Sequence, residues 1–432
     1  MQGRTSQGQF VFEERAAEPV PSVLYDEHVK LTGKSHIAAF AGYLMPLWYS
    51  SIAEEHRAVR QQAGLFDCTH MGVLEVSGPD AGSFLEAVST NKVQDLKLGR
   101  AKYGYILDAA GYVLDDIIVY RRGETNFMVV VNASNEQKIR FYLHELQAGR
   151  TVVDTQSSPW AAKLPAMRTS IADMRDSHRP KDRRVDLALQ GPASFDTLGK
   201  LTDAAAAKRI AELKSFAFVE EKVGGIDCLI CRTGYTGSNV GAELFVDPQQ
   251  APRLWNLILE TGKPLGVLPC GLGSRDSLRI EGGLPLYGHE LDGKFNLSPF
   301  EAGYGWAVKL DKEFFIGQAA MQRVAATYDM EVARIELSAA RGVRPIRQDD
   351  ALLGEKGECV GWVLSAAKAE EKQVALAYID RKVAQEGKSL GVYYLARSAS
   401  QAEQGRLQAV KKGQKVDADL AGTVASRFAK FS

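Results

Sequence analysis

The sequence has no long apolar segment and no excess of charge of either sign. No run approaches the ~18 consecutive apolar residues that a membrane-spanning helix requires. Lysine plus arginine equals aspartate plus glutamate, at 53 each. A balanced charge provides no electrostatic attraction to nucleic acid or to anionic lipid. We therefore expect partners that include neither nucleic acid nor a membrane.

The first 21 residues lack the apolar core of a secretory signal peptide, and their acidic residues argue against a transit peptide. They are predicted to form a polar N-terminal tail that ends near Pro19 and Pro21. With no targeting segment of either kind, we expect a cytoplasmic protein.

Cysteines are few and odd in number: Cys68, Cys228, Cys231, Cys270 and Cys359. This set suits a reducing cytoplasm better than a disulfide framework. Cys228 and Cys231 form a C-x-x-C pair, which leaves a redox pair or half a zinc site open. The stretch is typical of a strand, however, where positions three apart face opposite ways, so buried small apolar side chains are favoured. The seven histidines show no metal-ligand spacing, and we expect no metal site.

A chain of 432 residues suggests two or three domains. Residues 51–67 are predicted to form a helix that Ser50 or Ser51 caps and Gly64 ends. Residues 72–89 have the pattern of a strand, a Gly-Pro turn and a helix, and residues 185–201 repeat it. The repetition favours two related α+β lobes, with coincidence of a common turn as the alternative.

Residues 155–184 interrupt this pattern with a polar stretch that contains proline and is basic at its end. They are predicted to form an inserted surface segment, partly helical, rather than a binding element. From about residue 330 short strands follow one another at regular spacing, which predicts a C-terminal β-barrel or sandwich. The expected parts are a tail over 1–21, a catalytic region of two α+β lobes over 22–329, and a β domain over 330–432.

Two adjacent aspartates lie in the middle of an otherwise apolar strand, "GYVLDDIIVYRRG", residues 111–123. Since side chains alternate along a strand, Asp115 is expected on the face of Val113, Ile117 and Val119. Asp116 is expected on the other face, with Leu114, Ile118 and Tyr120. Whichever face is buried, one carboxylate points among apolar side chains, where it must find partners or shift its pKa.

Two further segments with many glycines hold polar groups among apolar ones. Glu243 lies in "CRTGYTGSNVGAELFV", residues 231–246, and "GLGSRDSLRIEGG", residues 271–283, contains Arg275, Asp276, Arg279 and Glu281. If the three segments converge, they form a pocket with an acidic and a basic end. Such a pocket suits a heterocycle with N–H donors and a carboxylate tail. The alternatives are a surface position for Glu243 and a helix-end salt bridge for Arg275 and Asp276.

The chain resembles the glycine cleavage system T-protein family of aminomethyltransferases over about residues 22–325. The segments that carry the resemblance, in the family's order, are "FAGYLMPLWY" (40–49), "SIAEEHRAVRQQAGLFDCTHMG" (51–72), "GYVLDDIIVY" (111–120), "VVVNASN" (129–135), "LALQGP" (187–192), "RTGYTG" (232–237), "GLGSRDSLRIEGGLPLYGHEL" (271–291) and "SPFEAGYGWAVKLDKEFFIGQAA" (298–320). The resemblance implies a three-domain cloverleaf around a central folate site, with tetrahydrofolate as the cofactor.

The resemblance also implies roles for single residues. It places Asp116 beside the reactive N5 and N10 atoms of the folate, as the catalytic residue, and Glu243 on the pteridine ring. The other positions that it places around the folate are Tyr103, Tyr235, Met71, Asn132 and, near the folate tail, Arg275. The implied reaction moves a one-carbon unit from the aminomethyl group on the lipoyl arm of the H-protein to tetrahydrofolate, and ammonia is released.

Two departures from the family pattern keep other functions open. Residues 363–373, "VLSAAKAEEKQ", replace an expected "TSG…SP" stretch of the C-terminal domain. Phe314 stands where relatives that assist iron–sulfur assembly have a cysteine. The alternatives are another folate-dependent methyl or one-carbon transferase or demethylase that acts on a small methylated donor, and a folate-binding protein without enzyme activity.

Overall fold

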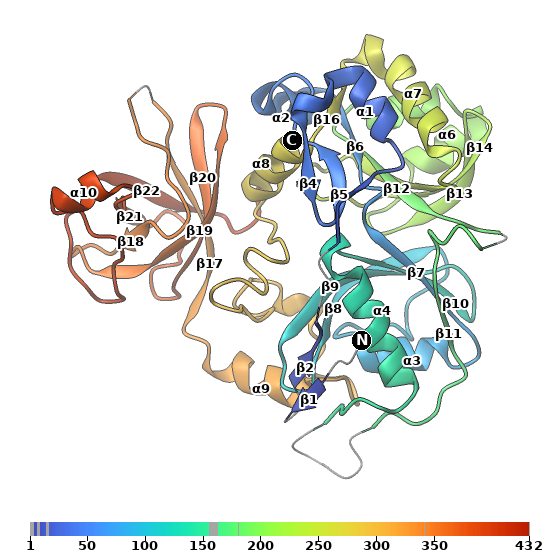
Figure 1. Ribbon diagram of the computed structural model, residues 1–432, viewed down its shortest axis with the longest axis horizontal. Coiled ribbons are helices and arrows are strands. Elements are labelled where there is room, and N and C mark those ends of the chain that lie inside the picture. Colours follow the sequence, from blue (N-terminus) through green and yellow to red (C-terminus); the bar gives the residue numbers. More distant parts are fainter. Residues whose placement is uncertain are drawn as a thin grey trace. The chain divides into compact units, whose positions relative to one another are not determined.

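The computed structural model describes residues 4–6, 9–13, 17–154, 163–179, 181–340 and 342–431. It divides into two compact units (Figure 1). The first unit comprises Met1–Gly234, Ser238–Gly273 and Trp306–Val324, and the second comprises Tyr235–Gly237, Ser274–Gly305 and Ala325–Ser432. The chain thus crosses between the units several times before its C-terminal part begins.

The first unit contains an antiparallel five-stranded sheet. Its strand order is β11 (Ser170–Asp173), β7 (Gly72–Ser77), β10 (Asn126–Val131), β9 (Val113–Arg121) and β8 (Arg100–Leu107). Helices α3 (Ala81–Val88) and α4 (Glu136–Gln147) pack on one face, where Phe84 and Tyr142 contribute to a buried core with Val119 and Val129. This is the first α+β lobe.

The same unit contains a six-stranded sheet that forms the second lobe. The order is β13 (Phe218–Val223), β14 (Ile226–Cys231), β15 (Gly241–Val246), β12 (Val185–Gln190), β6 (Ala63–Asp67) and β16 (Val267–Cys270), of which β16 and β6 are parallel. Its helices are α5 (Ser194–Gly199), α6 (Ala204–Ala211) and α7 (Ala251–Gly262). Leu198, Ile210 and Trp255 from these helices share one buried core with the strands.

The uncovered faces of the two sheets pack against each other. Their contact is a buried apolar cluster, here called the inter-sheet cluster, of Val73, Ala101, Tyr120, Met128, Val130, Met174, Phe218, Leu229, Cys231 and Phe245. The rings of Tyr120 on β9 and Phe245 on β15 lie 5.4 Å apart, edge to face. Strands β9, β14 and β15 are therefore covered on both faces, which explains why their sequences are so apolar.

The strand–turn–helix repeat is confirmed, because residues 72–89 form β7 and α3, and residues 185–201 form β12 and α5. The single helix predicted over 51–67 is wrong. Helix α2 (Ile52–Gln61) does begin after its cap Ser51, whose Oγ accepts from the amide of Glu54 at 3.2 Å. It ends before Gly64, because residues 63–67 form β6, which is paired on both sides.

The N-terminal residues contribute to the first lobe. Strands β1 (Arg4–Ser6) and β2 (Gln9–Val11) pair with each other, and Phe10 is buried in the core of the five-stranded sheet. The backbone N–H of Phe10 donates to Oδ2 of Asp108 at 3.2 Å. The polar composition of residues 1–21 did not predict this anchor, and a domain boundary at residue 21 stays a prediction.

The next residues form a small three-stranded sheet and a helix. The sheet has the order β3 (Val20–Pro21), β5 (Tyr43–Pro46) and β4 (Ile37–Phe40), and α1 (Tyr25–Thr32) precedes β4. This sheet leads directly into α2 and so into the second lobe.

Part of the predicted insertion, residues 155–184, belongs to the five-stranded sheet. Residues 155–162 and 180 lie outside the described residues. In the described remainder of 155–184 there is a strand, β11, and no helix, so the helical prediction is wrong for that part. β11 pairs with β7 along Ser170–Asp173, and Ile171 is buried in the first-lobe core, which accounts for the strand.

The second unit contains a closed barrel. Its strands, in order, are β17 (Met330–Ser338), β20 (Lys372–Asp380), β19 (Cys359–Ala369), β18 (Ala351–Leu353), β21 (Ser389–Tyr393) and β22 (Leu420–Ala425). Ile335, Val363, Ala377 and Val392 lie in its core, and a short helix, α10 (Ala399–Glu403), lies between β21 and β22. The sequence left a barrel or a sandwich open, and the barrel is confirmed, as is the α+β fold with two lobes.

Helices α8 (Leu272–Gly282) and α9 (Gln318–Thr327) complete the regular structure outside the barrel. A buried ion pair joins α8 to the barrel within the second unit. Arg279 Nη1 lies 2.8 Å from Glu290 Oε2, and Ser365 on β19 donates to Oε1 of the same carboxylate. Both charged side chains are almost fully buried.

Candidate functional site

Strand β9 carries the two aspartates in the arrangement that strand alternation predicts, with one difference. Ile117 and Val119 face the helix-covered core, whereas Ile118 and Tyr120 face the inter-sheet cluster. The difference is Leu114, which was expected on the face of Asp116 but packs with Ile117 and Val119. The register with β8 shifts here, since Leu107 pairs with Val113 and Ile106 with Asp115, and Leu114 is the extra residue of a bulge.

Asp115 is completely buried and accepts three hydrogen bonds. They come from the backbone N–H of Asn132 at 3.0 Å, the Asn132 side-chain amide at 2.8 Å and the Asn135 amide at 2.6 Å. Burial, and then the charge of Asp116, raises the pKa of Asp115 to about 7. The partner that the sequence required for Asp115 is therefore the asparagine pair that follows β10.

Asp116 is partly exposed, and the tyrosine that donates to it packs against two other aromatic rings. Its Oδ2 accepts from the hydroxyl of Tyr103 at 2.9 Å, and its Oδ1 accepts from the Asn132 amide at 2.7 Å. The ring of Tyr103 lies 5.3 Å from that of Tyr105 and 5.8 Å from that of Trp306, which is 51% exposed. Burial raises the pKa of the Asp116 carboxyl, so it holds a proton more tightly than an aspartate in water.

Glu243 lies on β15 with its side chain on the inter-sheet side, and it is 8% exposed. A surface position, the alternative left open by the sequence, is therefore excluded. Its Oε2 accepts from Thr233 Oγ1 and, at 3.4 Å, from the hydroxyl of Tyr120. Tyr120 and Asp116 share a face of β9 and are four residues apart, ~13 Å along a strand. The two carboxylates thus belong to one side of β9.

Met71 follows β6 in a short loop and packs against the inter-sheet cluster. Arg175 Nη1 donates to the backbone oxygens of His70 and Met71, each at 3.3 Å, and to the hydroxyl of Tyr43 at 3.2 Å. Sequence reasoning missed Arg175 because it lies in the stretch interpreted as an insertion. Arg175 lies two residues after Asp173, and its Nε donates to Asp173 Oδ1 at 3.1 Å. This acid–base pair in the sequence was a weak signal of an ordered segment.

Tyr235 and Arg275 belong to the second unit and contact each other. The guanidinium carbon of Arg275 lies 5.2 Å from the Tyr235 ring centroid, and the Tyr235 hydroxyl donates to the Pro285 carbonyl at 2.5 Å. Asp276 accepts from Arg279 at 2.8 Å. Arg279 is buried in the ion pair with Glu290. Of the two arginines in this segment, Arg279 therefore has a structural role.

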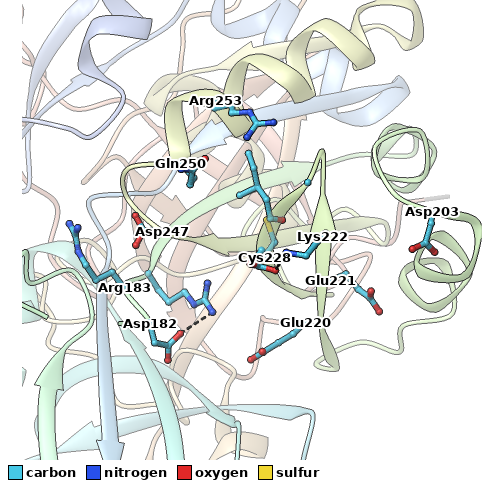
Figure 2. Close-up of a pocket in the computed structure, with 14 residues that line it drawn as sticks. Asp182, Arg183, Asp203, Glu220, Glu221, Lys222, Cys228, Asp247, Gln250 and Arg253 are labelled. Atoms are coloured by element: carbon cyan, nitrogen blue, oxygen red, sulfur yellow. Dashed lines mark hydrogen bonds and ion pairs between the residues drawn. The ribbon is translucent and has the colours of Figure 1, made fainter. Parts of the chain in front are cut away.

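A separate hollow of about 1010 Å³ lies on the second lobe (Figure 2). It is lined by Cys228 and by a mixture of acids and bases, including Asp182, Arg183, Glu220 and Arg253. The hollow borders the face of β14 that carries Cys228. Glu243 pairs with Cys231 and lies on the opposite face of the sheet. The hollow contains none of the predicted site residues.

The cysteines are all buried. Cys228 packs in the second-lobe core and Cys231 in the inter-sheet cluster, on opposite faces of β14, so they do not form a redox pair. Burial raises the pKa of the Cys228 thiol to about 12. In the described part of the chain no group of three or more His, Cys, Asp or Glu residues could hold a metal ion, and no described helix is long and apolar enough to cross a membrane.

Known proteins share both the sequence and the fold. A family model described as the GCVT N-terminal domain matches residues 24–312. The aminomethyltransferase of Streptomyces avermitilis is 40% identical over 344 residues, which are 79% of this chain and 84% of the relative. The aminomethyltransferase of Desulfitobacterium hafniense is 36% identical over 372 residues, 85% of this chain and 92% of the relative.

A solved structure extends the similarity to the whole chain. The glycine cleavage system aminomethyltransferase T from Bartonella henselae superimposes with a TM-score of 0.71 at 28% identity, over 94% of this chain and 96% of that one. The family model and the shared fold define a transferase of the GCVT class. More particularly, the chain belongs to the aminomethyltransferase family, the T proteins of the glycine cleavage system.

Proposed function

We propose that this aminomethyltransferase moves the one-carbon unit from the aminomethyl-lipoyl arm of the H-protein to tetrahydrofolate, with Asp116 as the catalytic residue. The observation that carries the proposal is the setting of Asp116, whose carboxylate accepts from Asn132 and from Tyr103, a tyrosine whose ring lies 5.8 Å from that of Trp306. A carboxylate whose pKa is raised by burial can accept a proton and return it more readily than an aspartate in water.

The donor set on the chain fits tetrahydrofolate. Glu243 offers a buried carboxylate, which only accepts hydrogen bonds when ionised and so matches the N–H edge of a pteridine. Arg275 offers a guanidinium for the anionic tail. When bound, tetrahydrofolate supplies the N5 and N10 amines that take up the carbon. Met71, Tyr103, Asn132 and Tyr235 are proposed as the remaining folate contacts.

The chemistry balances without an oxidant or reductant. The S–C and C–N bonds of the aminomethyl group break, and two C–N bonds form. The two accepting amines lose two protons. One proton ends on the lipoyl sulfur and the other on ammonia. In this proposal Asp116 moves these protons or stabilises positive charge on the carbon. Holding both substrates in one orientation lowers the barrier further.

The same proposal includes a cytoplasmic location and two partners. The partners are the lipoylated H-protein and folate. The five buried thiols suit a reducing cytoplasm.

The test mixes the protein with aminomethylated H-protein and tetrahydrofolate and measures ammonia release. Release that depends on all three components supports the proposal. Methyl transfer from a small methylated donor without ammonia release contradicts it and favours another one-carbon transferase. Tight folate binding without transfer from any donor contradicts it in favour of a binding protein.

A further inference from the structure

Two neighbouring carboxylates of β9 share one amide group. The side-chain nitrogen of Asn132 lies 2.8 Å from Oδ1 of Asp115 and 2.7 Å from Oδ1 of Asp116. Adjacent side chains of a strand normally point to opposite faces and do not meet. Asn132 makes the connection because it directly follows β10, the strand beside β9, and its backbone N–H also donates to Asp115.

An aspartate at position 115 lowers the stability of the fold compared with an apolar residue that would only fill the space. It is completely buried and adjacent to a second acid, so both desolvation and like charge disfavour its ionised form. Yet the three hydrogen bonds that it accepts all come from N–H groups, which favour the carboxylate. An apolar residue would fit the surrounding core at lower cost, and the donors indicate that a carboxylate is required.

Asn135 strengthens this conclusion. It is the N-cap residue of α4, where an asparagine side chain commonly accepts from the first turn of the helix. Here it makes no such bond and donates instead to Asp115 at 2.6 Å. Asn135 ends a 3-10 turn (Ala133–Asn135) with a helical backbone conformation, and its side chain is used to hold the buried acid.

We propose that Asp115, held by Asn135, is a positioning residue that acts through Asn132 to fix the orientation of the Asp116 carboxylate. This inference deepens the proposed function and rests on it, because Asp116 is the residue taken to move protons in the transfer. The two acids then titrate as a pair. The negative charge of one makes the other a stronger base.

Other ionisable groups face Asp115 and Asp116 and affect their pKa values. From β8, Tyr103 donates to Asp116, and the hydroxyl of Tyr105 lies 3.2 Å from that of Tyr103. From α4, the charge of Lys138 lowers the pKa of Asp115 in opposition to burial and to Asp116. The hydrogen bonds from Tyr103 and then Asn132 lower the pKa of Asp116, again in opposition to burial. The Asn132 bond that Asp115 helps to fix is therefore one of the effects that set the pKa of Asp116.

The test is a direct titration of the ligand-free protein. Carboxyl carbons of ¹³C-labelled aspartate are followed by NMR against pH in wild type and in Asp115→Asn, with Asp116→Asn used to assign the signal of Asp116. We expect the pKa of Asp116 to shift by about one unit or more in Asp115→Asn, because the Asn132 bond to Asp116 is no longer held by the Asp115 carboxylate. An unchanged Asp116 titration in a folded Asp115→Asn protein overturns the proposal.

Asp108→Asn is the matched control. Asp108 is also a buried acid of the first lobe, but it accepts from the backbone amides of Phe10, Ala110 and Tyr112. We expect its removal to leave the Asp116 titration where it is. An equal shift in this control would assign the effect to general loosening of the lobe and would overturn the proposal.

Asn135→Ala serves if Asp115→Asn does not fold. It removes one donor to Asp115 and no side-chain cap of α4. The upper pKa of the pair should rise, because the ionised form of Asp115 loses a hydrogen bond. Two unchanged pKa values would contradict the inference.

The pH dependence of ammonia release then links the pair to the reaction. In Asp115→Asn the acidic limb of kcat/KM should shift together with the Asp116 titration, whereas a merely structural loss would lower the rate at every pH. A wild type that releases no ammonia contradicts the proposed function. An active wild type whose limb does not move in the variant contradicts only the present inference.

Discussion

Tyr103 donates a hydrogen bond of 2.9 Å to Oδ2 of Asp116, and so orients an aspartate whose other oxygen accepts from the shared Asn132 amide. Tyr103 is on β8 and Asp116 on β9, in adjacent antiparallel strands. The bond fixes one oxygen of the carboxylate and leaves the group in a setting where burial raises its pKa. Asp116 is thereby set apart from the exposed acids of the same lobe.

Asp116→Asn should leave the protein folded and lower turnover at least ~100-fold, because an amide cannot take up the proton or carry the charge. Ammonia release and circular dichroism measure the two effects. Asp227→Asn, at an exposed position of β14 in the same unit, should keep the wild-type rate. A near-wild-type rate for Asp116→Asn would remove Asp116 from the mechanism.

Glu243→Gln should weaken tetrahydrofolate binding by ~10-fold or more, because a charged acceptor is replaced by a neutral amide of nearly the same shape. Calorimetry gives the dissociation constant. Glu124→Gln, an exposed position between β9 and β10, should bind folate like the wild type. Unchanged affinity in Glu243→Gln would rule out the pteridine contact.

Glu290→Gln should destabilise the second unit by ~3 kcal/mol, because it leaves the buried guanidinium of Arg279 without its counter-charge. Chemical denaturation measures the loss. Lys372→Met breaks an ion pair with Glu336 in which the lysine is 56% exposed, and it should cost less than ~1 kcal/mol. Equal losses in the two variants would show that burial of the Arg279–Glu290 pair does not matter.

Lys312 predicts a pH dependence of stability. Its ammonium donates to the backbone oxygens of Ser89 and Asn91 at 2.7 and 3.0 Å, and burial lowers its pKa to about 8. The folded chain therefore releases this proton at lower pH than the unfolded chain, whose lysine keeps a pKa of ~10.4. Stability should rise with pH between those two values.

Lys312→Met isolates this contribution. The difference in unfolding free energy, wild type minus variant, should become more favourable to the wild type from pH 8 to pH ~10. Urea denaturation at several pH values measures it. A difference that is constant over this range would contradict a lowered pKa for Lys312.

Local patterns in the sequence predicted much of the secondary structure. The alternation of β9, the cap at Ser51 and the two strand–turn–helix units all depend on near neighbours, and the structure has them. Errors arose where distant contacts decide. Residues 63–67 leave the helix because β12 and β16 pair with them, and Leu114 changes face because a bulge shifts the register with β8.

The candidate site shows the same division. The sequence alone determined that Asp115 and Asp116 need partners, since any strand with this pattern buries at least one of them. Only the tertiary structure decided which partners, because Asn132, Asn135 and Tyr103 reach the acids across strand pairs and from the start of a helix. Hydrogen-bond geometry between segments distant in sequence is fixed by packing, and residue order records it only indirectly.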